Sequence, residues 1–160
     1  MKNHLYFEKL KLLCTVFIFL LFACGDKLEE SCVAPTGGQF IEVRSMGTID
    51  IQFINDLRPS FGIPESFTAK YDVNVYAINY ATTDPDGKEA IATGAIYIPK
   101  TGNDYPLSLL SGQHGLTIKK QDVPSILPLY GYLGLFGAAK GYASVQADYL
   151  GLGNSDVQNQ

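Results

Sequence analysis

The stretch that decides the fold is Pro106–Leu116, PLSLLSGQHGL. Its apolar run Leu107–Leu110 predicts a short buried strand, which ends at Ser111–Gly112. His114–Gly115 follows at once, and His114 is one of only 2 histidines in the chain. A buried strand that ends in His-Gly can turn backbone N–H groups toward a ligand, because glycine allows a close approach of the backbone. We expect the other elements to be arranged around this strand end.

A β-hairpin is predicted ahead of that strand. Tyr71–Ala81 alternates between an apolar face and a polar-aromatic face, which is typical of a strand. The turn TDPDGK follows at Thr83–Lys88, where Pro85 presets its own φ and Gly87 tolerates a positive φ. Ala90–Pro99 returns as a second alternating strand, so the pair is predicted to be antiparallel.

A crossover unit is predicted after the strand end. Leu133–Lys140 favours a helix with Gly141 as the residue that ends it, and Tyr142–Asp148 favours another strand. Gly134 and Gly137 inside the helix indicate close packing on a sheet. Hairpin, strand, helix and strand in this order predict an α/β sheet, mainly parallel, with antiparallel strands at one edge. If the sheet ended at Tyr142–Asp148, this strand would expose an apolar edge and make the chain poorly soluble.

A short helix is predicted before the hairpin. The apolar residues of Ile49–Leu57 fall on one helical face, Thr48 can cap the helix, and Pro59 and Gly62 stop it. We interpret it as a packing helix without chemistry of its own.

The N-terminal residues predict a targeting segment. Lysines in residues 1–11 precede Leu12–Phe22, an apolar run that is shorter than the roughly 20 residues needed to span a bilayer and that fits a signal-peptide core. The run ends at Ala23–Cys24, which resembles a bacterial lipobox, where the cysteine is lipidated and becomes the mature N-terminus. An ordinary secretory signal with a chance cysteine stays open. The expected organisation is a lipoprotein signal peptide at 1–23, a lipidated tether at 24–40 and an incomplete domain at 41–160.

The resemblance to lipoproteins implies a place in the cell envelope. Cys24 would anchor the protein to a bacterial membrane, and the acidic stretch Asp26–Glu30 resembles the surface-export signals of Bacteroidetes lipoproteins. A plain solvated tether explains the same stretch, so outer membrane and cell surface both stay open. Cys32 is the only other mature thiol, which leaves no internal disulfide framework. The net charge of -4 provides no basic surface, so no nucleic-acid partner is expected.

Four motifs together resemble the α/β-hydrolase fold: DPDG at Asp84–Gly87, QHG at Gln113–Gly115, KGY at Lys140–Tyr142 and DYLGLGNS at Asp148–Ser155. The pattern is most similar to the secretory lipase- and esterase-like hydrolases among bacterial lipoproteins, and it covers Tyr71–Ser155. The implied fold class is α/β, as the N-terminal part of an α/β-hydrolase sheet in which an antiparallel edge hairpin is followed by parallel strands with a crossover helix.

The resemblance implies an oxyanion hole at the opening stretch. In such hydrolases the loop after the third strand supplies one backbone N–H, and the residue after the nucleophile supplies the other. The oxyanion-hole candidates are therefore His114, Gly115 and Leu116, with His114–Gly115 setting the turn and the N–H of Leu116 or Gly115 as donor. His114 is not expected to be the general base, and a core histidine bonded to a nearby carbonyl is the simpler interpretation of its side chain.

A second strand end follows at Asp148. Asp148, Tyr149, Gly151 and Gly153 are expected to shape a loop that borders the pocket. Asp148 itself is not expected to be catalytic, because the acid of the family follows the nucleophile in the sequence, whereas Asp148 precedes any candidate for it.

The sequence lacks the residues that would complete a catalytic triad. It contains no G-x-S-x-G, and His4 falls in the predicted signal peptide. The nucleophilic serine, the acid and the histidine are therefore expected beyond Gln160, in a longer protein. No metal or cofactor is expected, because 2 histidines and one mature thiol lie far apart.

Two classes of function fit a hydrolase-like fold, and a β-rich surface-binding domain with no relation to hydrolases stays open as a third possibility. The first is the N-terminal portion of a lipid-anchored serine hydrolase, an enzyme only at full length, which cleaves carboxylic esters or lipids through an acyl-enzyme. Its partners would be a small-molecule ester or lipid substrate and the membrane. The second is a non-catalytic envelope lipoprotein with a hydrolase-like binding domain. A prolyl-oligopeptidase-type peptidase shares the fold and stays open as a variant of the first.

Overall fold

The computed structural model describes residues 38–102 and 106–156. The predicted signal peptide, the lipidation site Cys24 and Cys32 lie outside these residues, so the expectations for them stay predictions. No helix within the described ranges is both long enough and apolar enough to cross a membrane.

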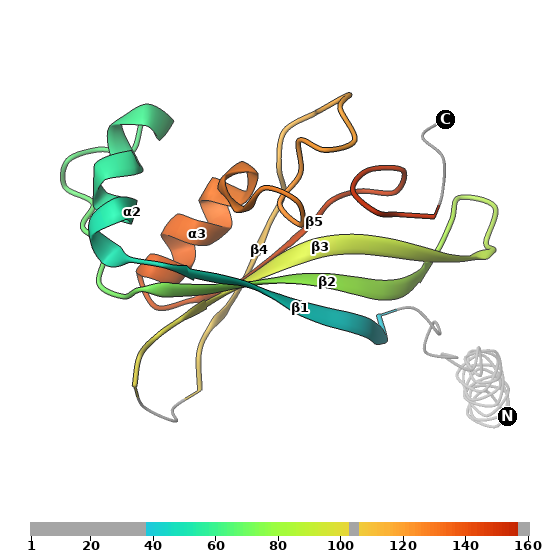
Figure 1. The fold of residues 1–160 in the computed structure, drawn as a ribbon, viewed down its shortest axis with the longest axis horizontal. Helices are drawn as coiled ribbons and strands as arrows, with labels where there is room; N and C mark the ends of the chain where they lie inside the picture. Colours follow the sequence, from blue (N-terminus) through green and yellow to red (C-terminus); the bar gives the residue numbers. More distant parts are fainter. Residues whose placement is uncertain (1–37, 103–105, 157–160) are drawn as a thin grey trace, which may run out of the picture. The chain divides into compact units, whose positions relative to one another are not determined.

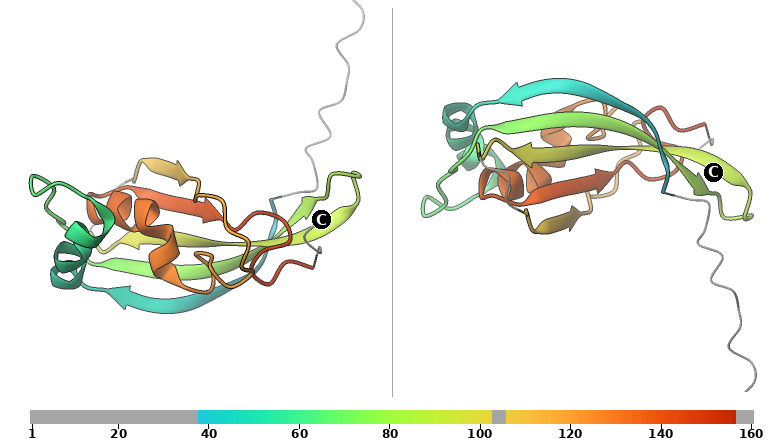
Figure 2. Two further views of the ribbon diagram at one scale, coloured as in Figure 1. Left: turned by 90° about the horizontal axis from the view of Figure 1, so that it is seen from above. Right: turned by 90° about the horizontal axis from the view of Figure 1, so that it is seen from below.

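One sheet organises the domain, in the strand order β1-β2-β3-β5-β4 (Figure 1). Helices α2 and α3 lie on the same face of this sheet (Figure 2). The elements in chain order are β1 Phe40–Ile49, α2 Ile51–Leu57, the 3-10 helix η1 Arg58–Phe61, β2 Val73–Thr83, β3 Glu89–Pro99, β4 Leu109–Gly112, the 3-10 helix η2 Pro128–Gly131, α3 Tyr132–Ala139 and β5 Ala143–Ala147.

The predicted hairpin is confirmed. β2 and β3 pair antiparallel in unbroken register from Val73 opposite Pro99 to Thr83 opposite Glu89. The turn closes through a backbone hydrogen bond from Asp84 N–H to the Lys88 carbonyl at 2.9 Å. Gly87 has a φ of 78°, as its place in the turn requires.

Strand β1 was not predicted from the sequence. It pairs antiparallel with β2, and its register shifts twice, between Phe40 and Glu42 and between Ser45 and Gly47. These irregularities break the alternation of apolar and polar residues by which a strand is recognised. The strand begins at Phe40, the last residue of the predicted tether.

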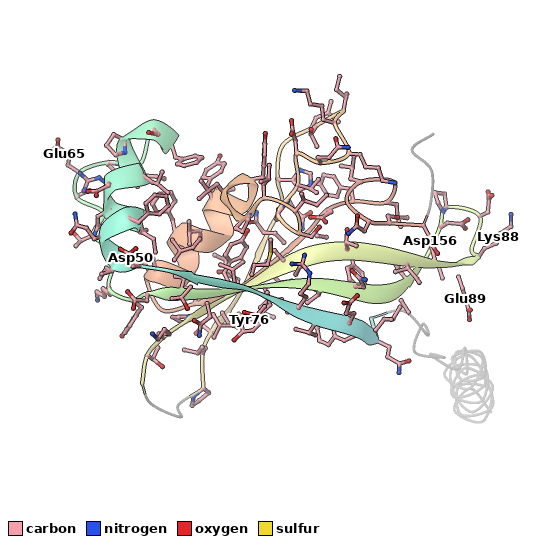
Figure 3. All side chains as sticks on the ribbon, in the orientation of Figure 1. Asp50, Glu65, Tyr76, Lys88, Glu89 and Asp156 are labelled. Carbon is pink, nitrogen blue, oxygen red and sulfur yellow. The ribbon has the colours of Figure 1, made fainter. Side chains whose placement is uncertain are left out.

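Helix α2 is confirmed, but its predicted cap is wrong. Thr48 belongs to β1, where its hydroxyl donates to the side-chain oxygen of Asn74 at 2.7 Å. Asp50 is the cap instead, and its carboxylate accepts from Phe53 N–H at 2.9 Å at the junction of β1 and α2 (Figure 3). An aspartate in extended conformation satisfies a free N–H of the first helical turn as well as a threonine would.

The crossover after the hairpin is confirmed. β4 and β5 are parallel and α3 connects them, while β5 is antiparallel to β3. The described residues therefore form an α/β domain, as predicted. The prediction of a mainly parallel sheet with the hairpin at its edge is wrong, because three of the four pairings between the described strands are antiparallel and β1 covers the outer side of the hairpin. Gly141, with a φ of 110°, ends α3 as predicted.

The glycines of α3 allow it to lie directly on the sheet. A Cβ on Gly134 would lie 2.8 Å from the Gln146 side-chain oxygen, and a Cβ on Gly137 would collide with Leu110. The close packing predicted for both glycines is confirmed. The core between the sheet and the helices contains buried residues of each layer: Ile54, Val73, Val75, Ala95, Tyr97, Leu135, Phe136 and Ala139.

Two predictions about the sheet edge are wrong. β5 lies between β3 and β4, so Tyr142–Asp148 is not the exposed edge. β4 is the edge, and it is not buried: the side chain of Leu109 is 74% exposed. An apolar run predicts a strand, but it does not reveal the place of that strand in the sheet, which here follows from the insertion of β5.

Candidate functional site

After β4 the chain continues in an irregular segment, and its part His114–Leu116 is called the turn after β4. His114 is half-buried, whereas Gly115 is exposed and the Leu116 side chain is 96% exposed. Among the described residues, the backbone N–H groups of Gly115 and Leu116 donate no hydrogen bond to another protein group. Because both residues are exposed, these N–H groups are open to water or to a ligand.

The side chain of His114 bonds within its own turn. Its Nδ1 lies 2.7 Å from the carbonyl oxygen of Gly115. Because a carbonyl only accepts, we assign the proton of the neutral ring to Nδ1. His114 Nε2 is then an acceptor, buried and without a partner in the described part of the chain.

Tyr149, directly after the Asp148 strand end, contacts this turn. Its ring lies over the His114 ring with centroids 4.3 Å apart and planes tilted by 34°. Its hydroxyl donates a hydrogen bond of 2.8 Å to the carbonyl oxygen of His114. The structure thus brings together His114 and Tyr149, which are 35 residues apart in sequence.

Asp148 lies in the interior. It is 0% exposed, and its carboxylate accepts from the Thr93 hydroxyl at 2.6 Å and from Ser125 N–H at 3.2 Å. Its own N–H donates to the Thr93 carbonyl at 2.9 Å. Asp148 therefore connects β5, β3 and the loop before η2, which is a structural task.

Gly151 and Gly153 form the turn that follows. Gly153 N–H donates to the Lys120 carbonyl at 2.9 Å, and Gly151 N–H reaches the Ser155 hydroxyl at 3.3 Å. Gly153 has a φ of 59°, and a Cβ there would lie 2.6 Å from the Asp148 carboxylate. This turn holds the loop that runs from Lys120 to Ser125.

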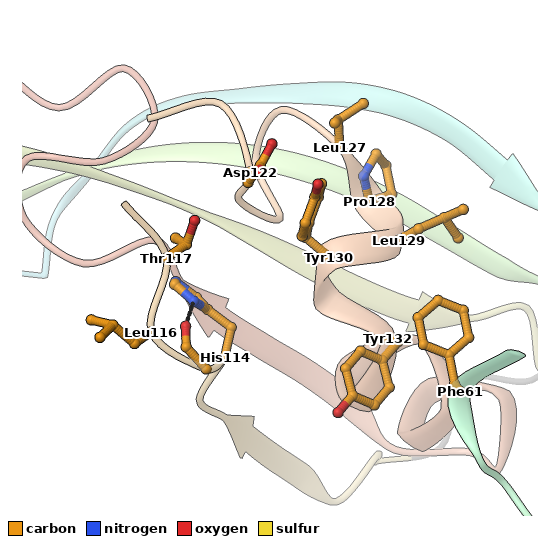
Figure 4. A pocket seen from close by; sticks show the side chains of 11 residues that line it. Phe61, His114, Leu116, Thr117, Asp122, Leu127, Pro128, Leu129, Tyr130 and Tyr132 are labelled. Atoms are coloured by element: carbon orange, nitrogen blue, oxygen red, sulfur yellow. Dashed lines mark hydrogen bonds between the residues drawn. The ribbon is translucent and has the colours of Figure 1, made fainter. Parts of the chain in front are cut away.

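A cavity of about 880 Å³ adjoins the turn after β4. Its size lies in the range of small-molecule sites. Figure 4 shows His114 and Thr117 across the cavity from Tyr130, Tyr132 and Phe61. It is lined by residues of η1, of the turn and of the segment around η2: Phe61, His114, Gly115, Leu116, Thr117, Asp122, Leu127, Pro128, Leu129, Tyr130 and Tyr132.

The second wall of the cavity was missed by sequence reasoning. Phe61 and Tyr132 stack with centroids 4.8 Å apart and planes 20° apart, although their segments are distant in sequence. Asp148, Tyr149, Gly151 and Gly153 do not line this cavity; Tyr149 adjoins it through its contact with His114. Their predicted role as a pocket border stays a prediction.

The polar groups of the cavity are acidic or neutral. The Tyr130 hydroxyl bonds to the Asp122 carboxylate, which raises the pKa of Tyr130 above its ordinary value of 10. No lysine or arginine lines the cavity among the described residues. The same part of the chain holds no group of three His, Cys, Asp or Glu side chains that could ligate a metal.

No family model matches the chain. No curated protein matches it either. Several solved structures match the chain. A protein from Legionella pneumophila assigned as a hydrolase superposes with a TM-score of 0.67 and 30% identity, over 75% of this chain and 33% of that one.

The rice cell wall degrading esterase LipA from Xanthomonas oryzae matches as well. A single-site mutant of it gives a TM-score of 0.61 and 27% identity, and its ligand-bound form gives 0.59 and 29%. Each match covers 74% of this chain and 31% of LipA. The chain thus spans about a third of the length of the structures that it resembles. Its described domain has the α/β-hydrolase-like fold of these hydrolases and esterases.

Proposed function

We propose that the chain is the N-terminal part of a lipid-anchored serine hydrolase that cleaves carboxylic esters or lipids through an acyl-enzyme. The observation that carries this proposal is the pair of free N–H groups on Gly115 and Leu116, at the edge of a largely apolar cavity. The similarity to an esterase at 27–29% identity supports the same reaction class.

The geometry suits one half of an oxyanion hole. When a serine attacks an ester carbonyl, the carbonyl oxygen becomes an anion, and N–H groups fixed beforehand stabilise it. Loss of one such donor typically costs about 3–4 kcal/mol of transition-state stabilisation. In this proposal the serine, the acid and the general-base histidine follow Gln160.

A fluorophosphonate probe tests the proposal, because it labels only activated serines. We expect the full-length product of the gene to be labelled and to hydrolyse p-nitrophenyl butyrate. Residues 1–160 alone are the matched control and should stay unlabelled. A full-length protein that is neither labelled nor active would favour a non-catalytic envelope lipoprotein, whereas cleavage of a proline-containing peptide substrate in place of the ester would favour a peptidase.

Anchoring is tested separately. We propose that Cys24 carries lipid and places the protein in the cell envelope, at the outer membrane or the cell surface. Radiolabelled palmitate should enter the wild-type protein and the Cys32→Ser variant, but not the Cys24→Ser variant. Equal labelling of both variants would contradict the proposal.

The cavity favours a neutral, apolar acyl group. Its aromatic wall offers dispersion contacts, and Asp122 together with the absence of a lining cation disfavours an anionic group within the described site. Hydrolysis should therefore be faster for p-nitrophenyl butyrate than for the monoester of a dicarboxylic acid of equal length. No nucleic acid is proposed as a partner.

A further inference from the structure

Tyr149 lies outside the set of residues that line the cavity, yet its hydroxyl contacts the backbone of the proposed oxyanion hole. We propose that Tyr149 is a positioning residue, which orients the donor N–H of Gly115 by holding the peptide between His114 and Gly115. This inference rests on the proposed function and concerns how the same site is organised.

The planarity of the peptide bond couples the directions of a carbonyl and of the N–H that follows it. In a trans peptide the carbonyl of one residue and the N–H of the next point in opposite directions within one plane. All described peptide bonds are trans. The hydrogen bond of 2.8 Å from the Tyr149 hydroxyl to the His114 carbonyl therefore also fixes the direction of the Gly115 N–H.

The next peptide is fixed in the same manner. His114 Nδ1 bonds the Gly115 carbonyl at 2.7 Å, and this carbonyl shares its plane with the N–H of Leu116. Two side chains thus hold two successive peptides by their carbonyls, while both N–H groups stay free among the described residues. Without these bonds a turn with an exposed glycine could rotate its peptides, because glycine has no side chain to restrict them and no atom beyond its two chain neighbours lies within 4 Å of the place where a Cβ of Gly115 would be.

Tyr149 is itself held firmly. Its φ of 59° lies in the left-handed region, where it is the sole non-glycine residue of the described chain. Residues with side chains persist there only where the surroundings fix them. The preceding residue, Asp148, is fully buried and bonded to two elements, and the His114 ring covers one face of the tyrosine. The Tyr149 hydroxyl, which donates to the His114 carbonyl, is thereby held in place by the buried residue Asp148 that precedes it.

The test uses the full-length protein and the Tyr149→Phe variant, which keeps the ring and removes the hydroxyl. Tyr142→Phe is the matched control, because Tyr142 is similarly exposed, at 45% against 39% for Tyr149, and has no hydroxyl contact among the described residues. With p-nitrophenyl butyrate we expect kcat of Tyr149→Phe to fall about tenfold at unchanged KM, a fraction of the roughly 100- to 1,000-fold lost when a donor is removed outright. The melting temperature of Tyr149→Phe should equal that of the wild type. For Tyr142→Phe, kcat, KM and the melting temperature should all equal the wild-type values.

A boronic acid inhibitor provides the second measurement, because it forms a tetrahedral anion on the serine. Its affinity should fall in Tyr149→Phe by the same factor as kcat. If Tyr149→Phe equals Tyr142→Phe, or if only KM rises, the positioning role is wrong while the proposed hydrolase stands. If the wild-type protein itself neither turns over ester nor binds boronate, the proposed function is wrong.

Amide hydrogen exchange in the wild-type protein decides the matter should Tyr149→Phe fail to fold. The amides of Gly115 and Leu116 should exchange rapidly in the free enzyme and slowly with boronate bound. Slow exchange in the free enzyme would show that both N–H groups already have partners, which overturns the inference.

Discussion

The ends of β4 and β5 lie side by side in parallel, yet they differ in burial and in hydrogen bonding. At the end of β5, Asp148 is fully buried, and its carboxylate and its N–H are all hydrogen-bonded. At the end of β4, Gly115 and Leu116 are exposed, and their N–H groups have no protein partner among the described residues. Of these two neighbouring strand ends, one is buried with its polar groups hydrogen-bonded, and the other is exposed with free N–H groups.

A reactive turn can be both open and fixed if the residues beside it are firmly bonded. Unsatisfied donors cannot hold a loop in place, because they have no bonds to break when the loop moves. A satisfied strand end next to them can do so, and Tyr149 makes the connection through the His114 carbonyl. Functional groups are generally precise when the residues behind them are locked by packing and hydrogen bonds.

The largest effect is expected at the satisfied end. Asp148→Ala leaves the Thr93 hydroxyl and the Ser125 N–H buried without their acceptor, so the free energy of unfolding should fall by about 3–5 kcal/mol. Asp84 is the matched control, because its carboxylate also accepts two hydrogen bonds, from the N–H groups of Asp86 and Lys88, but it is only half-buried in a turn whose other residues are exposed to water. Asp84→Ala should cost about 1 kcal/mol. Urea denaturation measures both; equal losses would contradict the contrast.

Leucines next to the two ends provide the second test. Leu152 is 3% exposed and Leu116 is 96% exposed. Leu152→Ala should lower the free energy of unfolding by about 2–4 kcal/mol, because it opens a cavity in the core. Leu116→Ala should change it by less than about 0.5 kcal/mol. A large loss at Leu116 in urea denaturation would show that this side chain is covered in the protein as measured.

Substitutions of two glycines measure how tightly the backbone after β5 is packed. Gly153 and Gly62 both have positive φ, at 59° and 65°, but only Gly153 has neighbours that a Cβ would strike. Gly153→Ala should cost about 2–3 kcal/mol, from backbone strain plus the clash with Asp148 and Thr93. Gly62→Ala should cost about 1 kcal/mol from strain alone. Thermal melting of the two variants compares them, and the reverse order would refute the packing described for Gly153.

The smallest effect concerns alkaline pH. Burial raises the pKa of Tyr97 above its ordinary value of 10, and the Asp148 carboxylate adds to the rise. Above pH 10 the unfolded chain releases a proton that folded Tyr97 retains, so stability is complete below this pH and declines by about 1.4 kcal/mol per pH unit above it.

Substitution at position 97 separates this titration from other alkaline effects. Tyr97→Phe should remove one proton from the dependence of stability on pH, so that stability declines less steeply above pH 10 by about 1.4 kcal/mol per pH unit. Urea denaturation between pH 9 and about pH 11 measures it. A slope that is unaltered in Tyr97→Phe would mean that this tyrosine ionises as readily in the folded state as in the unfolded one.

The sequence predicted those parts of the fold that depend on residues close together in the chain. The hairpin follows from alternation and the DPDG turn, and α3 follows from its apolar residues and Gly141, so both were recognisable within a few residues. β1 was missed because two register shifts hide its alternation. The edge position of β4 was missed because strand order depends on where β5 inserts, which no property of Leu109–Gly112 encodes.

The candidate site was predictable only in the part that a short stretch of sequence encodes. The motif QHG drew attention to the turn, and the geometry there agrees with a histidine bonded to a nearby carbonyl. The hydrogen bond from Tyr149 to the His114 carbonyl connects residues from two strand ends, and the stacking of Phe61 on Tyr132 connects two further segments. Such pairings arise only when distant segments meet, so the residues next to each partner in the sequence carry no signal of them.

The strand order also has a consequence for the timing of folding. β4 leaves the ribosome before α3 and β5, but its sheet partner among the described strands is β5, about thirty residues later. The hairpin of β2 and β3 can close during synthesis, since its strands are adjacent, whereas β4 must wait. The turn that bears Gly115 consequently takes shape only after β5 has been made, and a nascent chain stalled before β5 would contain the finished hairpin but not the paired strand β4 that supports this turn.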